Sequence, residues 1–86
     1  MYSNEYSQAD YDNFCYNFFM KEFAERLKEL RTDKGLSLRE LAKLVNLSFS
    51  AIAQWENESR IPNAEAVVIL AKFFGVTTDY LLGVSD

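Results

Sequence analysis

Apolar residues recur every three or four positions through most of the chain, and no stretch shows the sustained alternation of a half-buried strand. Glycine follows three of these periodic segments, where a helix commonly ends in a left-handed residue. The segments and their glycines are 22–33 before Gly35, 64–74 before Gly75 and 78–82 before Gly83. The pattern therefore predicts an all-α fold.

Two further, shorter helices are predicted directly after the first of these glycines. The first begins with a capping box, in which Ser37 and Glu40 each bond the backbone N–H of the other. Its amphipathic face consists of Leu38, Leu41, Ala42 and Val45. Asn46 tolerates the left-handed turn that follows. Ser48 can then cap a second helix over about 48–57.

This second helix has an anchored face and a free face. Ile52 and Trp55 point towards the core, whereas five residues fall on the other side: Phe49, Ser50, Ala53, Gln54 and Asn57. Two helices joined by so short a turn form a helix-turn-helix, which can place the free face of its second helix in a major groove. We expect one core made of Leu27, Leu30, Leu41, Ala42, Val45, Leu47, Ile52, Trp55, Val67, Leu70, Ala71, Phe74 and Leu81.

Composition argues against catalysis and metal binding. The 86 residues, enough for one domain, include no His and a single Cys, so catalytic pairs that use His and a conventional zinc site lack their side chains. We therefore expect no enzyme, no metal, no cofactor and no small-molecule ligand. The chain has no apolar run of membrane-spanning length and no basic start of a signal peptide, so we expect a cytoplasmic protein.

The formal net charge of −4 is unusual for a protein that binds nucleic acid, because phosphate neutralisation supplies much of the affinity. Residues 1–20 contribute −3 of this charge, from three acids and no base, and residues 21–86 only −1, from nine bases and ten acids. The local face decides binding. Three bases and three acids occupy the helix-turn-helix region: Arg39, Lys43 and Arg60 against Glu40, Glu56 and Glu58.

Residues 22–83 resemble the Xre/Cro family of helix-turn-helix domains, which includes the lambdoid phage repressors. The resemblance rests on FAERLKELRTDKGLSLRELAKLVNLSFSAIAQWENE and RIPNAEAVVILAKFFGVTTDYLLG, above all on their WEN and GVTTDYLLG motifs. It implies a compact five-helix, repressor-like domain of bacterial or phage origin that binds double-stranded operator DNA, usually as a dimer. The function implied is transcriptional regulation, with repression as the expected direction.

Carried over position by position, the resemblance implies three groups of site residues. Base edges are contacted by Phe49, Ser50 and Gln54. Phosphates are contacted by Lys43, Ser48, Asn57 and Arg60. A structural ion pair joins Arg31 to Glu56. Bidentate pairing with adenine is the natural chemistry of a Gln in this position.

The chain departs from the family pattern at three positions. Asn46 replaces the usual glycine of the turn, and Glu58 stands where the family often has glycine, beside the DNA. Phe49 stands where Gln is common. Its ring cannot donate a hydrogen bond, so two interpretations remain open: contact with a thymine methyl group, or packing at the start of the helix.

Residues 1–20 form an aromatic extension, which we expect to be helical, ahead of a DNA-binding domain over 21–86. The extension holds seven of the 13 aromatic residues: Tyr2, Tyr6, Tyr11, Phe14, Tyr16, Phe18 and Phe19. A near-heptad stripe of Tyr16, Met20, Phe23, Leu27 and Leu30 runs from it into the first helix. The extension either packs on the domain itself or forms an interface. We expect a homodimer through residues 1–20, with Tyr80 near the interface.

A second class of function fits the same features. The neutral charge around the helix-turn-helix and the aromatic extension are compatible with a protein-interaction module, a helix-turn-helix scaffold whose aromatic extension binds another protein. An antitoxin-like protein, which binds both DNA and a protein, lies between the two classes. The match of the second helix to a DNA-reading helix favours the regulator.

Overall fold

Five helices and no strand make up the described part of the chain, which in this computed structural model is the backbone of residues 8–84 and the side chains of residues 20–84. In chain order the helices are α1 (Gln8–Asp33), α2 (Leu38–Val45), α3 (Phe49–Glu56), α4 (Ala64–Phe74) and α5 (Thr78–Leu82). The all-α, five-helix prediction is confirmed. None of these helices combines the length and the apolar character needed to cross a membrane.

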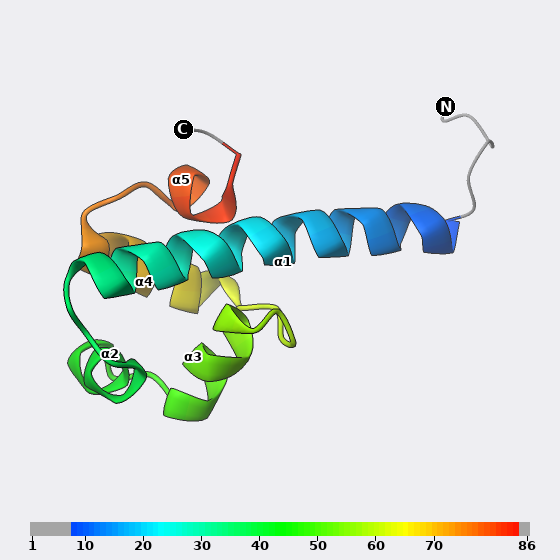
Figure 1. Ribbon diagram of the computed structural model, residues 1–86. Helices are drawn as coiled ribbons and strands as arrows, with labels where there is room; N and C mark the ends of the chain where they lie inside the picture. The colour runs from blue at the N-terminus through cyan, green and yellow to red at the C-terminus, as the bar shows by residue number, and fades with distance from the viewer. Residues whose placement is uncertain (1–7, 85–86) are drawn as a thin grey trace.

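The long helix α1 is the element on which the others are arranged (Figure 1). It contacts α3 on one side and α5 on another, while α2 contacts α3 and α4, and α4 contacts α5. Every helix contributes at least one fully buried side chain to the space between them. These residues are Phe23 and Leu27 of α1, Leu41 of α2, Ile52 of α3, Leu70 of α4 and Leu81 of α5.

The short helices begin at side chains that satisfy their first backbone N–H groups. The predicted capping box is confirmed: the Ser37 N–H donates to Glu40 Oε1 at 2.8 Å, and the Glu40 N–H donates to Ser37 Oγ at 3.1 Å. Ser48 caps α3 as expected, since its Oγ accepts the N–H of Ala51 at 3.2 Å. These local bonds set where α2 and α3 start.

Within residues 8–84, two residues other than glycine adopt left-handed backbone. Asn46 ends α2 at φ 57° and ψ 43°, the conformation expected for the turn between the two helices. Glu58 lies at φ 66°, just beyond α3, so the position where the family often has glycine keeps the geometry that favours glycine. Both positions therefore hold left-handed backbone although neither residue is glycine.

The core matches the predicted list closely. Ten of its residues are buried: Leu27, Leu41, Ala42, Val45, Ile52, Trp55, Val67, Leu70, Ala71 and Leu81. Leu30, Leu47 and Phe74 are only partly buried and pack on the outside of this cluster. The prediction omitted Phe23, one of the largest fully buried side chains, and four further buried residues, namely Met20, Ala24, Ala51 and Ala66.

Helix α1 is continuous from Gln8 to Asp33, so the helix predicted over 22–33 and the described part of the extension, which was expected to be helical, form one helix. Residues 8–21 contain no glycine or proline, so nothing in the sequence interrupts the backbone hydrogen bonds of the helix. Met20 and Phe23 of the predicted stripe are buried in the domain. The side chains of the seven aromatic residues of the extension lie outside the described residues.

The close approach of the α5 end to α1 generates a stability prediction. Gly83 and Gly75 both have positive φ, 82° and 72°, so alanine is strained at either position. A Cβ at Gly83 would also lie 2.5 Å from the Glu22 Cβ, which cannot rotate away, whereas nothing lies within 4 Å of a Cβ at Gly75. Gly75→Ala should cost about 1 kcal/mol of unfolding free energy, and Gly83→Ala should cost at least about 1 kcal/mol more, because overpacking forces a backbone shift.

Urea denaturation of the two variants beside the parent measures this difference. Equal losses in the two variants would show that the last turn does not press against α1.

Candidate nucleic-acid interface

Helix α3 is held to the domain by its apolar side. Ala51, Ile52 and Trp55 are buried, and the Trp55 ring meets Phe23 of α1 edge-on, with ring centroids 6.2 Å apart and an interplanar angle of 73°. The edge-to-face arrangement is a favoured one for aromatic pairs. The opposite side of α3 is consequently fixed in direction and left open.

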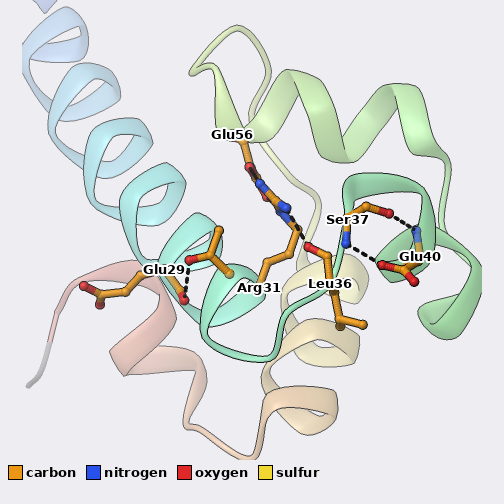
Figure 2. A network of polar contacts seen from close by, with 7 residues as sticks. Glu29, Arg31, Leu36, Ser37, Glu40 and Glu56 are labelled. Carbon is orange, nitrogen blue, oxygen red and sulfur yellow. Dashed lines mark hydrogen bonds and ion pairs between the residues drawn. The ribbon is translucent and has the colours of Figure 1, made fainter.

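The end of α3 is tied to α1 by the Arg31–Glu56 ion pair. Arg31 Nε and Nη2 donate to the two carboxylate oxygens of Glu56 at 2.6 and 2.9 Å, and Arg31 Nη1 donates to the Leu36 carbonyl at 2.7 Å. Figure 2 shows the guanidinium reaching from α1 to Glu56, beside the capping box at the start of α2. One side chain thus links α1, the loop before α2 and the end of α3.

The pair is largely removed from water, with the Arg31 and Glu56 side chains only 12% and 8% exposed. The hydrogen bonds to Glu56 raise the pKa of Arg31 above its usual value; burial opposes this shift and the charge of Glu56 adds to it. The group is a base with a raised pKa, so its contribution to stability is present at neutral pH and is lost only at strongly alkaline pH.

Ser50 and Gln54, two of the three expected base-reading residues, lie together on the open side of α3. Gln54 Nε2 donates to Ser50 Oγ at 3.4 Å; Ser50 is exposed and Gln54 is half-buried. A Gln amide has a second N–H and a carbonyl oxygen, which are the groups that pair with adenine N7 and N6. The bond to Ser50 therefore uses one N–H of the Gln54 amide, and the second N–H and the carbonyl oxygen are not part of it.

Phe49, the third expected base-reading residue, opens α3 and is 38% exposed. Its ring lies outside the buried core and makes a cation–π contact with the guanidinium of Arg39, whose Cζ lies over the ring at 4.5 Å from the centroid. Arg39 belongs to the first turn of α2. Sequence reasoning missed this contact, because the two residues are ten positions apart and on different helices.

The four expected phosphate contacts lie around α3, and all are exposed. Lys43 is in the last turn of α2, Ser48 is the N-cap of α3, and Asn57 is its C-cap, followed by Arg60. Asn57 Oδ1 accepts the Ser59 N–H at 3.1 Å and the Ser59 hydroxyl, an Asx turn that the Asn-x-Ser sequence could have predicted. Ser48 Oγ and Asn57 Oδ1 act only as acceptors in these bonds. Among residues 20–84, no acceptor is bonded to the Ser48 hydroxyl or to the Asn57 amide N–H groups.

Sequence comparison relates this geometry to known proteins. A helix-turn-helix family model matches residues 27–81, from the last two turns of α1 into α5. The HTH-type transcriptional activator BcrR of Enterococcus faecalis is 44% identical over 61 residues, which are 71% of this chain and 30% of that protein. The HTH-type transcriptional regulator AnsR of Bacillus subtilis is 42% identical over 59 residues, or 69% and 51%. The chain thus spans a third to a half of these relatives.

Structural comparison agrees. The crystal structure of the restriction-modification controller protein C.AhdI from Aeromonas hydrophila matches with a TM-score of 0.66 and 34% sequence identity. The match covers 72% of this chain and 94% of that chain. Nearly all of C.AhdI is therefore matched by about three quarters of this chain.

The Arg31–Glu56 ion pair generates a second stability prediction. Arg31→Met alone or Glu56→Leu alone strands one charge in a poorly hydrated place, so each should lower the unfolding free energy by about 3 kcal/mol. The double variant strands no charge and should be more stable than either single variant. Denaturant titration of the four proteins forms a double-mutant cycle. A double variant that loses the sum of the two single losses would show that the charges are not coupled.

Proposed function

Because the chain belongs to the helix-turn-helix family, whose relatives above are transcriptional regulators, we propose that it binds double-stranded DNA through α3 and regulates transcription. The observation that carries the proposal is the open polar side of α3, where Ser50 and Gln54 are bonded to each other on a helix fixed by Trp55 and the Arg31–Glu56 pair. Rigid placement of such side chains is what groove reading requires.

In this proposal α3 enters the major groove and reads bases with few charges. Gln54 pairs with adenine, Ser50 holds the amide and reaches a neighbouring base pair, and the exposed edge of Phe49 contacts a thymine methyl group. Repression follows most directly, because a protein seated on an operator excludes other proteins from it. This direction of regulation is tested by a reporter gene placed behind the selected operator.

Phosphate contacts come from both ends of α3. Lys43 and Ser48 approach one strand at the start of α3, and Asn57 and Arg60 approach the backbone at its other end. Only two of these four residues carry a positive charge, and Glu58 carries a negative charge nearby. A single domain therefore gains little from counterion release, and the combined sites of two domains are needed for tight binding.

The partner we propose is a second copy, held through residues 1–20. Residues 8–19 of α1 add about 18 Å of helix ahead of the buried Met20. Figure 1 shows this part of α1 extending past the other helices. It carries five aromatic residues in its sequence, Tyr11, Phe14, Tyr16, Phe18 and Phe19. A helix of this composition that extends beyond its own domain is suited to pack against its symmetry mate.

The proposal predicts that the loss of a base contact and the loss of a phosphate contact change DNA affinity and sequence preference in different ways. Gln54→Ala should cost roughly 1–3 kcal/mol on the best operator and relax the preference at one or two positions. Lys43→Ala and Arg60→Ala should weaken binding to every sequence alike and lower the salt slope by about one each. The measurements are selection of bound sites from random DNA, then titrations on the selected operator and on random DNA at several salt concentrations.

The matched control is Lys72→Ala, which removes a positive charge from the last turn of α4, away from α3. If Gln54→Ala binds the operator as tightly as the parent, α3 does not read bases through Gln54, and the interaction-module alternative gains.

The assembly proposal predicts that the full chain sediments as a dimer, whereas a chain that begins at Met20 sediments as a monomer at the same concentration. The shortened chain keeps the buried Met20 and Phe23, and circular dichroism checks that it is folded. A full-length variant with Phe14→Ser and Phe18→Ser should also shift towards monomer, without removal of any backbone. Two chains of equal oligomeric state would place the interface elsewhere.

A further inference from the structure

At the start of α3, Phe49 lies against Arg39 of α2. The helix itself, FSAIAQWE, contains no Lys or Arg, and Phe49 has no hydrogen-bond donor on its side chain. Arg39 of α2 brings a guanidinium to 4.5 Å from the centroid of the Phe49 ring. Five N–H donors therefore lie beside the first residue of a helix that otherwise has no positive charge.

The Arg39 guanidinium is not engaged by the rest of the domain. Among the residues with described side chains, no carboxylate forms an ion pair with it. The adjacent Glu40 is occupied by the capping box, where it accepts the Ser37 N–H at 2.8 Å. Arg31, in contrast, donates from Nε and Nη2 to Glu56 and from Nη1 to the Leu36 carbonyl. Arg39 is thus placed by an aromatic face while its hydrogen-bonding edge stays available.

Stacking suits a guanidinium that must bind something else along its edge. The face of a planar guanidinium packs on an aromatic ring, and its N–H groups lie in the plane of the group. A fork held in this way can bond O6 and N7 of guanine together, which is the commonest specific contact in the major groove. The ordering of a long side chain before binding also lowers the entropy lost on binding.

We propose that Arg39 is a specificity-determining residue that reads a guanine beside the Gln54 contact, and that Phe49 is the positioning residue that holds its guanidinium. The inference rests on the proposed DNA binding through α3. It gives Phe49 a role that neither earlier interpretation contained, since the ring acts through its contact with Arg39. It also adds to the site a base reader located on α2, the helix before the recognition helix.

The decisive experiment compares sequence preferences and not affinities alone. Sites are selected from random DNA with the parent, Arg39→Ala, Arg39→Lys and Phe49→Leu. Arg39→Ala should lose the preference for guanine at one position by roughly 10- to 100-fold. Arg39→Lys keeps the charge but lacks the fork, so it should keep the salt slope and lose most of that preference. Phe49→Leu keeps an apolar side chain without a π face and should weaken the same preference.

Two controls connect the effect to the stacked pair. Phe49→Leu added to Arg39→Ala should cause no further loss at that position, because the ring acts through the guanidinium. An operator with 7-deazaguanine at that position removes the N7 acceptor, and it should weaken the parent but not Arg39→Ala. Lys43→Ala, one turn further along α2, should lower binding to all sequences and leave the guanine preference intact.

The outcomes separate this inference from the function on which it rests. If Arg39→Ala weakens all sequences alike, Arg39 contacts only phosphate and the inference is overturned. It is also overturned if Arg39→Ala selects the same sites as the parent while Gln54→Ala does not, and in that case DNA reading through α3 stands. If the parent selects no sequence at all, both the inference and the proposed function fall.

Discussion

The direction in which α3 faces depends on the ion pair between Arg31 and Glu56. Apolar burial of Ile52 and Trp55 fixes which side of the helix is inward, but it is non-directional and tolerates small rotations. The two parallel hydrogen bonds of the pair, at 2.6 and 2.9 Å, add a fixed geometry at the end of the helix. The third bond, to the Leu36 carbonyl, joins the loop that leads into α2 to the same guanidinium. Desolvation offsets much of the energy of such a pair, so its main effect is on orientation.

The helices were predictable where short-range chemistry decides them. Capping side chains, left-handed residues and apolar spacing all act within four residues, so Ser37, Ser48 and Asn46 could be interpreted from the chain alone. A helical extension ahead of residue 22 was also expected, but its fusion with the first helix into one continuous α1 was not, although residues 8–21 contain no glycine or proline that would end a helix. Burial was harder to predict at the edge of the core, where the side chains of Leu30 and Phe74 are only partly buried.

The sequence allowed us to predict which residues belong to the candidate site, but not which contacts these residues make with one another. The resemblance named Gln54 and Ser50, but their mutual hydrogen bond depends on side-chain torsions that no spacing rule specifies. The Arg39–Phe49 stack depends on how α2 and α3 cross, which is set by the packed core between them. Contacts of this kind follow from tertiary structure and not from the spacing of residues along the chain.

The fluorescence of Trp55 reports on the surroundings of α3. Trp55 is the only tryptophan of the chain, it is 4% exposed, and its indole Nε1 has no hydrogen-bond partner among the described residues. An indole in such a dry, apolar place emits at short wavelength and is shielded from quenchers dissolved in water. Separation of α3 from α1 would uncover the ring, whereas a ligand on the opposite face of α3 would leave it covered. The intrinsic fluorescence of this protein should therefore report whether α3 is packed against α1, and it should change little when a ligand binds the open side of α3.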